Sequence, residues 1–339
     1  MVMSEFLHMR VDVKRLFLGK SIHGIGLGCM SLSHAYGPPP AVEAAGDLLR
    51  RAVDLGIQHI DTAALYGLGR NEKLIGDSLK AVRDQVFIAS KAGMRYVGET
   101  RVIDGRPETL KRTCEESLQR LQTDHIDLYY LHRVDPNVPV EESAGALGDL
   151  VAAGKIGAVG LSEVSATTLL RAHRITPIAA VQSEYSLWTR NPEMAVLNAC
   201  RDIGAAFVAF SPLGRGFLAG GVAHGATGLG GFKPGDIRAR MPRFQEPNLS
   251  YNLEQFEAFE ALARNAYVTP AQLALAWVLS RGDHIHAIPG TTNAQHLEQN
   301  HFTPLSIAPQ VLAQAGVLIN HGTIWGDRYP ASLEAEAAF

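Results

Sequence analysis

An acid, a phenol, an ammonium group and an imidazole each follow a short apolar run in this sequence. Asp61 lies in the run at 59–63 and Tyr66 comes five residues after it, while Lys91 and His132 each follow a further apolar run. An ionisable group at the end of a buried strand loses hydration energy unless it meets a partner. A lone His or Lys in such a place is explained more readily by an ordinary structural role, such as a surface charge, and a lone Asp by a helix cap. Four of them after successive apolar runs indicate a shared site.

These four side chains together suit proton donation to a carbonyl oxygen. A phenol is a poor acid at neutral pH, because its unperturbed pKa is about 10. A nearby ammonium group favours the phenolate, so Lys91 is expected to lower the pKa of Tyr66 and make it a general acid. Asp61 would neutralise and orient Lys91, and His132 would donate a hydrogen bond to the same oxygen. The sequence shows no Ser or Cys nucleophile triad and no metal signature such as H-E-x-x-H, so no metal is expected.

The elements that position these residues are predicted from alternating periodicities. The apolar runs predicted as strands are 25–30, 59–63, 86–90, 126–131, 158–162, 179–183, 206–210 and 286–289. Helical periodicity lies between them, as in 107–121 and in 140–153, where Val140, Ala144, Leu147 and Val151 define one face. Mostly apolar strands that alternate with helices indicate a parallel sheet covered by helices.

Eight strand–helix units favour one closed (β/α)8 TIM barrel over two domains. We predict a single domain over 1–339, with the barrel proper at 24–303 and a β-hairpin before it at 11–23. The longest interval precedes the eighth strand and contains a Gly-rich stretch at 214–235 and two helical segments. Such a loop is typical of an active-site lid, although a surface insertion explains its composition equally well. In a barrel the carboxyl ends of all strands meet on one face, which would bring the four residues together.

A doubly wound dinucleotide-binding fold is the second possibility, because glycines cluster at 24–28. Gly24, Gly26 and Gly28 follow G-x-G-x-G rather than the G-x-G-x-x-G of the fingerprint. The next acid that ends a strand, Asp61, lies well beyond the roughly 20 residues that the fingerprint requires. Close packing of a barrel strand explains these glycines better.

Composition indicates a globular protein with a small-molecule partner. Hydrophobic types make up 46% of the chain and charged types 19%, enough for a large core. The 31 Lys and Arg against 34 Asp and Glu give a net charge of −3, which argues against nucleic acid or a membrane surface as partner. Three cysteines suit neither a disulfide framework nor a zinc cluster, and no signal-peptide core is visible, so we expect a cytoplasmic protein.

Four segments of the sequence resemble the aldo-keto reductase family. They are GIQHIDTAALYG at 56–67, ASKAG at 89–93, DLYYLH at 127–132 and FSPLG at 210–214. The resemblance implies a (β/α)8 barrel and NADPH-dependent reduction of an aldehyde or ketone to an alcohol. It also implies a catalytic tetrad of Asp61, Tyr66, Lys91 and His132, with Tyr66 as general acid. These are the four residues that their positions already indicated.

The same resemblance implies a set of cofactor contacts, with NADPH expected and NADH as second choice. The matching positions are Gly28, Cys29, Met30, Asp61, Ser162, Glu163, Gln182 and Phe210 around the nicotinamide, Ser211, Pro212, Leu213, Gly214 and Arg215 along the pyrophosphate, and Pro289, Gly290, Thr291, Thr292, His296, Gln299 and Asn300 around the adenosine phosphate. Ser162 and Gln182 would match the acceptor and donor of the carboxamide. A strand-to-helix turn with a Thr cap also accounts for 289–292, but the matching segments around it favour binding.

Two departures from the family pattern concern the cofactor. Glu163 stands where many members have Asn, and an ionised Glu accepts hydrogen bonds but cannot donate them. Thr292 and His296 stand where members often place Lys or Arg against the 2′-phosphate. We therefore expect a preference for NADPH over NADH that is smaller than in members with a cation there.

The substrate is the least determined feature. Tyr36, Met94, Tyr185 and Trp188 follow predicted strands and would suit a pocket for aromatic or flat carbonyl compounds. They are equally consistent with ordinary half-buried loop residues. The family also includes ancillary subunits of potassium channels, which bind cofactor but serve as interaction partners. An intact tetrad does not separate the two classes, whereas turnover of NADPH with a panel of aldehydes would.

Overall fold

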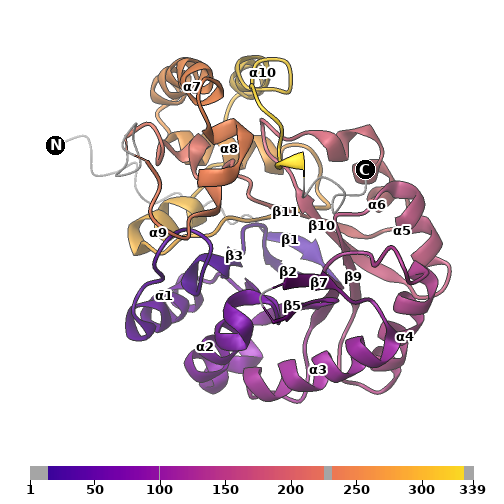
Figure 1. Cartoon of the computed structure of the whole chain (residues 1–339). Coiled ribbons are helices and arrows are strands. Elements are labelled where there is room, and N and C mark those ends of the chain that lie inside the picture. The colour runs from indigo at the N-terminus through magenta and orange to yellow at the C-terminus, as the bar shows by residue number, and fades with distance from the viewer. Residues whose placement is uncertain (1–13, 99, 225–230, 332–339) are drawn as a thin grey trace.

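Eight parallel strands form a barrel in the computed structural model, which describes residues 14–98, 100–224 and 231–331 (Figure 1). The barrel strands are β3 (Leu27–Gly28), β4 (His59–Asp61), β5 (Phe87–Ala92), β8 (Leu128–Leu131), β9 (Val159–Ser162), β10 (Ile178–Glu184), β11 (Ala206–Phe210) and β12 (Ile285–Ile288). Each strand pairs in parallel with the next. Parallel bridges between Ile25 and Ala287 and between Gly28 and Gly290 join the last strand to the first. All eight predicted strands are confirmed, and with them the predicted barrel.

Helices surround the strands on the outside of the barrel (Figure 1). They are α1 (Val42–Asp54), α2 (Arg70–Leu79), α3 (Pro107–Leu121), α4 (Val140–Ala152), α5 (Ala166–His173), α6 (Val196–Asp202), α7 (Asn248–Asn265), α8 (Pro270–Leu279), α9 (Ala294–His301) and α10 (Pro309–Leu318). The predicted helix at 140–153 is observed as α4, with Val140, Ala144 and Leu147 buried. Val151 was expected on the same face but is 37% exposed. Within the described residues, no helix has both the length and the apolar character that a membrane span requires.

An N-terminal hairpin closes the amino end of the barrel. β1 (Lys14–Phe17) pairs antiparallel with β2 (Lys20–His23), as predicted, while residues 11–13 of the expected hairpin lie outside the described residues. Phe17 is fully buried, and its ring centroid lies 4.9 Å from those of His59 and Phe87 and 4.6 Å from that of His286. His59 and Phe87 are the first residues of β4 and β5, and His286 is the second residue of β12. Side chains therefore fill this end, and the carboxyl ends of the strands remain for a ligand.

Two insertions follow strands at the carboxyl end. A second hairpin, β6 (Met94–Val97) with β7 (Thr100–Ile103), follows β5 and was not predicted. The interval before β12 contains α7 and α8, which are the two expected helical segments. Its Gly-rich part is described only in places, because residues 225–230 lie outside the described part of the chain.

Truncation of Phe17 tests the closed end of the barrel. Phe17→Ala is expected to lower the free energy of unfolding by about 3–5 kcal/mol, because it leaves a cavity in a fully buried ring cluster. Leu16, its neighbour on β1, is 71% exposed, so Leu16→Ala serves as a matched control. That control should change stability by less than about 0.5 kcal/mol. Urea denaturation followed by circular dichroism measures both variants. Equally small effects would show that the hairpin does not stabilise the barrel.

Candidate active site

A buried ion pair lies at the carboxyl end of the barrel. Lys91, in β5, places its Nζ 2.5 Å from Oδ1 of Asp61 at the end of β4, and the two side chains are 1% and 3% exposed. Lys91 also donates to the carbonyl oxygen of Thr62 at 2.8 Å, and Gln182 donates to Oδ2 of Asp61 at 2.7 Å. Both charges are therefore compensated inside the protein, where an isolated charge would be very costly.

Tyr66 lies beside this ion pair on a tight 3₁₀ turn at Tyr66–Gly69. Gly67 and Gly69 have φ angles of 57° and 84°, and a Cβ atom at Gly67 would lie 2.9 Å from the Cβ of Ser33. The turn that carries Tyr66 therefore requires glycine after it. Lys91 Nζ lies 5.1 Å from the centroid of the Tyr66 ring.

The environment of Tyr66 differs from the sequence-based expectation in one respect. Burial raises the pKa of Tyr66, Lys91 acts to lower it, and Asp61 acts to raise it, so that the net shift is upward. The expectation of a lowered pKa is therefore wrong, because the sequence does not reveal how deeply the phenol is buried. The ammonium group of Lys91 offsets part of the effect of burial.

His132 follows β8 and faces Tyr66. The two ring centroids are 5.8 Å apart at an interplanar angle of 79°. Burial, and after it the charges of Arg133 and Lys91, hold the pKa of His132 well below its usual value. The imidazole is therefore neutral at physiological pH and keeps one N–H to donate. Within the described residues its Nδ1 has no hydrogen-bond partner. The structure thus brings the four predicted side chains together.

A large cavity opens beside these four residues. Its volume is about 1320 Å³, and its lining extends from Tyr66 and His132 to Thr292 and Asn300. Pockets for small ligands usually measure roughly 300–1,000 Å³, so this cavity has room for an extended ligand together with a small one.

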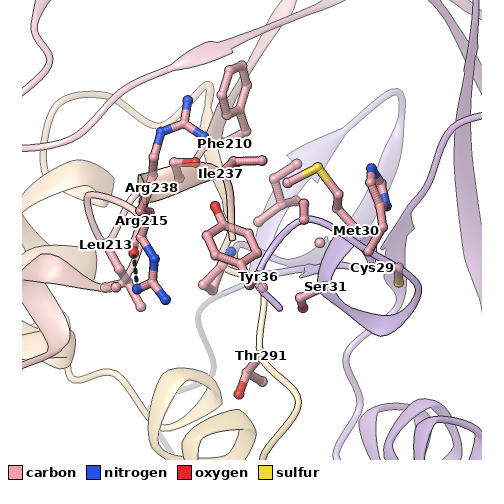
Figure 2. A pocket seen from close by; sticks show the side chains of 18 of the residues that line it. Cys29, Met30, Ser31, Tyr36, Phe210, Leu213, Arg215, Ile237, Arg238 and Thr291 are labelled. Carbon is pink, nitrogen blue, oxygen red and sulfur yellow. Dashed lines mark hydrogen bonds between the residues drawn. The ribbon is translucent and has the colours of Figure 1, made fainter. Parts of the chain in front are cut away.

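The walls of the cavity come from segments far apart in the sequence. Figure 2 shows Cys29 and Met30, which follow β3, on one side, and Phe210 and Arg215, from the end of β11 and its loop, on the other. Thr291, which follows β12, lies between the two walls at the bottom of the view. The carboxyl ends of the first and the last two barrel strands thus shape one continuous cavity.

Most of the predicted contact residues line this cavity. They are Gly28, Cys29, Met30, Asp61, Ser162, Gln182, Phe210, Ser211, Pro212, Leu213, Arg215, Pro289, Gly290, Thr291, Thr292, His296, Gln299 and Asn300, together with Tyr36 and Met94 of the predicted substrate pocket. Glu163, Gly214, Tyr185 and Trp188 are not part of the lining. Lys91 lies behind it, in contact with Asp61.

Two predicted substrate-pocket residues belong to the core instead. Tyr185 is 0% exposed and donates its hydroxyl hydrogen to Glu193 at 2.7 Å. Trp188 is 1% exposed and stacks on Phe217, with ring centroids 4.6 Å apart. These aromatic side chains fill the space under the loop that follows β10, so they do not face a substrate.

Glu163 belongs to a buried ion network rather than to the cavity wall. Its Oε2 accepts from Arg328 Nη1 at 2.8 Å, and its Oε1 accepts from the backbone N–H of Glu184 at 2.7 Å. Glu184 accepts from Arg215 Nη2 at 2.6 Å and from Arg328 Nε at 3.0 Å. Two buried carboxylates are thus matched by two guanidinium groups.

This network connects the C-terminal segment to the cavity. The guanidinium carbon of Arg328 lies 5.8 Å from the Phe210 ring centroid and 4.6 Å from that of Tyr329, which lines the cavity. Sequence reasoning missed Arg328, which is 144 residues from its partner Glu184. The available signal was the pair of acids at the ends of the apolar strands β9 and β10, since each needs a counter-ion.

Several other polar residues of the lining were also missed. His34 follows β3 and places its ring centroid 5.4 Å from that of Tyr66. Five cations also line the cavity: Arg101, Arg133, Lys233, Arg238 and Arg240. Arg238 is held by Asp236, with a distance of 2.7 Å between Nη2 and Oδ2. No local spacing marks these residues, because the path of the segments that carry them depends on the tertiary fold.

Removal of Arg328 tests the ion network. Burial acts to raise the pKa of Glu184, but Arg215 and Arg328 outweigh it and lower this pKa to about 2, against an ordinary value of 4.5. A lowered folded-state pKa stabilises the protein above pH 4.5 and ceases to do so as the pH falls toward 2. Arg328→Met should therefore lower the free energy of unfolding by about 3–5 kcal/mol at neutral pH. The loss should shrink in urea titrations at successively lower pH.

Arg264→Met provides the control for this measurement. Arg264 is 73% exposed and forms only a 3.7 Å pair with Glu260, so its removal should change stability by less than about 0.5 kcal/mol. A penalty for Arg328→Met that stays constant with pH would mean that Arg328 stabilises the fold by packing and not by charge.

Comparisons with known proteins show what the chain as a whole is similar to. The model of the family described as "Aldo/keto reductase family" matches residues 24–304. The chain is 41% identical over 320 residues to the probable aldo-keto reductase 1 of Glycine max, covering 93% of this chain and 91% of that protein.

Solved structures give the same result. A glycerol dehydrogenase from Gluconobacter oxydans matches with a TM-score of 0.82 at 27% identity, covering 91% of this chain and 95% of that one. An aldo/keto reductase from Klebsiella pneumoniae, in complex with NADP and acetate, matches with a TM-score of 0.71 at 26% identity, covering 94% and 99% of the two chains.

Proposed function

This chain belongs to the aldo/keto reductase family of oxidoreductases, and we propose that it uses NADPH to reduce the carbonyl group of an aldehyde or ketone to an alcohol. The observation that carries the proposal is the buried Lys91–Asp61 pair beside Tyr66 and His132, at one end of a cavity of about 1320 Å³ whose lining extends to Thr292 and Asn300. The Klebsiella pneumoniae relative in complex with NADP supports the choice of cofactor.

The residues at the tetrad end of the cavity fit a nicotinamide carboxamide. Ser162 Oγ accepts from Arg133 at 3.2 Å, which leaves its hydroxyl hydrogen to donate. Gln182 donates its amide hydrogen to Asp61, which leaves its carbonyl oxygen to accept. One donor and one acceptor from adjacent strands match the two polar ends of a carboxamide. Glu163 is bound to Arg328 and is not needed for this contact.

Tyr66 is the general acid in the proposed reaction. A bound NADPH would supply the hydride that the carbonyl carbon needs. The Tyr66 hydroxyl donates its proton to the carbonyl oxygen. Because burial raises the pKa of Tyr66, the phenol is protonated at neutral pH and ready to donate. The neutral His132 donates a hydrogen bond to the same oxygen and fixes its position.

Lys91 acts through Tyr66. Burial acts to lower the pKa of Lys91, but Asp61 and Tyr66 outweigh it and raise this pKa, so the ammonium group keeps its charge. A positive charge beside the phenol stabilises the phenolate that remains after proton transfer. Asp61 holds this charge in place through the 2.5 Å contact.

Substitution of Tyr66 tests the proton donor. Tyr66→Phe keeps the aromatic ring but removes the donor, so turnover of an aldehyde should fall by about 10²-fold or more while NADPH binding is retained. Absorbance of NADPH measures turnover, and quenching of tryptophan fluorescence measures binding. Tyr251→Phe, on the outer helix α7, is the control that loses the same hydroxyl.

Two outcomes would contradict this assignment. Turnover of Tyr66→Phe at the wild-type rate would remove Tyr66 from the role of acid. A wild-type protein that binds NADPH but turns over no aldehyde of a broad panel would instead favour a cofactor-binding subunit of the channel-associated type.

Cofactor selection provides a further prediction at the adenosine end. Thr292 and His296 line the cavity there and are exposed. Asn293 caps the N-terminus of α9, whose first turn contains His296. NADPH exceeds NADH by a 2′-phosphate, which hydroxyl, imidazole and helix N-terminal groups bind. His296→Ala should lower the ratio of kcat/KM for NADPH to that for NADH by about twofold to tenfold. If Arg240→Ala lowers the ratio and His296→Ala does not, the loop before α7 selects the cofactor.

A further inference from the structure

Arg133 lines the cavity at the end where the tetrad lies. It directly follows His132 after β8. Its Nη1 donates to the carbonyl oxygen of His132 at 2.8 Å and to Oγ of Ser162 at 3.2 Å. These two bonds fix one edge of the guanidinium plane against the ends of β8 and β9.

The opposite edge of this guanidinium group has no partner in the described part of the chain. Nε is buried without a hydrogen bond, and no hydrogen bond between described residues uses Nη2. Nε and Nη2 form the edge along which arginine binds a carboxylate by two parallel N–H bonds. Elsewhere in this chain Arg171 binds Glu141 through that edge, with both distances 2.8 Å.

No carboxylate of the described residues pairs with Arg133. The two acids that are close along the chain or in the site are already occupied. Asp135 accepts from the backbone N–H groups of Gly105 and Asn137, and Asp61 is paired with Lys91. A partly buried guanidinium group without a counter-ion costs desolvation energy. A bound anion would offset this cost.

The charge of Arg133 acts at the reacting end of the cavity. Among the charges around His132, that of Arg133 does most to lower its pKa, and Arg133 also acts to lower the pKa of Tyr66. The predicted phosphate contacts lie at other positions, in the loop after β11 and in the segment before α9. An anion at Arg133 therefore belongs to the substrate and not to the phosphates of the cofactor.

We propose that Arg133 is a specificity-determining residue that binds a carboxylate carried by the carbonyl substrate, so that oxo acids are preferred over neutral aldehydes and ketones. This inference rests on the proposed reductase function and adds its substrate class. Nη2 of the guanidinium group binds the carboxylate, while Tyr66 and His132 bind the carbonyl oxygen. The carboxylate is unchanged in the reaction, in which Tyr66 protonates the carbonyl oxygen and a bound NADPH would supply the hydride.

Formylbenzoates provide a matched set of probes. The 2-, 3- and 4-formylbenzoates place a carboxylate at three distances from the aldehyde, whereas benzaldehyde and methyl 4-formylbenzoate carry no charge. For the wild type, kcat/KM for at least one formylbenzoate should exceed that for benzaldehyde by about tenfold or more, as a charge-assisted hydrogen bond implies.

Three variants separate charge, geometry and general effects. Arg133→Met removes the cation at similar length and should abolish the preference for the formylbenzoate over benzaldehyde. Arg133→Lys keeps the charge without the planar fork and should leave an intermediate preference. Arg112→Met, on the outer face of α3 with a side chain 56% exposed, should keep the wild-type ratio. Circular dichroism and NADPH affinity show whether each variant is folded and binds cofactor.

Two results of the kinetic comparison would overturn the proposal. The first is an unchanged ratio of kcat/KM values in Arg133→Met. The second is an equal loss for all aldehydes together with weaker NADPH binding, which would assign Arg133 to the cofactor through Ser162. If the wild type turns over no aldehyde, the proposed function fails, and calorimetry of benzoate binding to the NADPH-loaded protein decides the role of Arg133. Equal benzoate affinities of wild type and Arg133→Met would then overturn it.

Discussion

Compensation of buried charge at the strand ends is the constraint on which the site of this protein depends. Lys91 and Asp61 lie on adjacent strands, and Gln182 reaches Asp61 from β10. The ion pair therefore joins three strands of the barrel at the level of the cavity floor. Loss of either charge would leave the other isolated in a low-dielectric interior, which costs several kcal/mol. The position of the ammonium group beside Tyr66 follows from this arrangement, since Lys91 donates both to Asp61 and to the carbonyl oxygen of Thr62.

The same principle distinguishes the other charged groups around the cavity. Glu163 and Glu184 are matched by Arg328 and Arg215, and these pairs form part of the rigid frame. Arg133 is different, because its bonds in the described structure go to a carbonyl and a hydroxyl group. Charged groups whose partners all lie within the protein build the walls of such a site. Groups with hydrogen-bond donors left over provide the contacts that a ligand can make.

The sequence predicts those features of the fold and site that depend on local patterns. Apolar runs define the eight strands, and the convergence of their carboxyl ends places Tyr66 and His132 in one cavity. The direction of an aromatic side chain in a loop depends on distant partners, which is why Trp188 was expected in the cavity but stacks on Phe217. The net pKa shift of Tyr66 and the pairing of Glu163 with Arg328 depend on burial and on contacts across the fold, which no spacing reveals.

The ion network of Arg328 has a consequence for biosynthesis. A ribosome synthesises the chain from its N-terminus, so Glu163 and Glu184 emerge 165 and 144 residues before Arg328, which pairs with both. Until then the nascent barrel holds two strand-end carboxylates with half of their counter-charge missing. The segment around Arg328 therefore completes the charge balance of a site whose other walls are synthesised earlier, and the cavity reaches its final form only once that segment has been made.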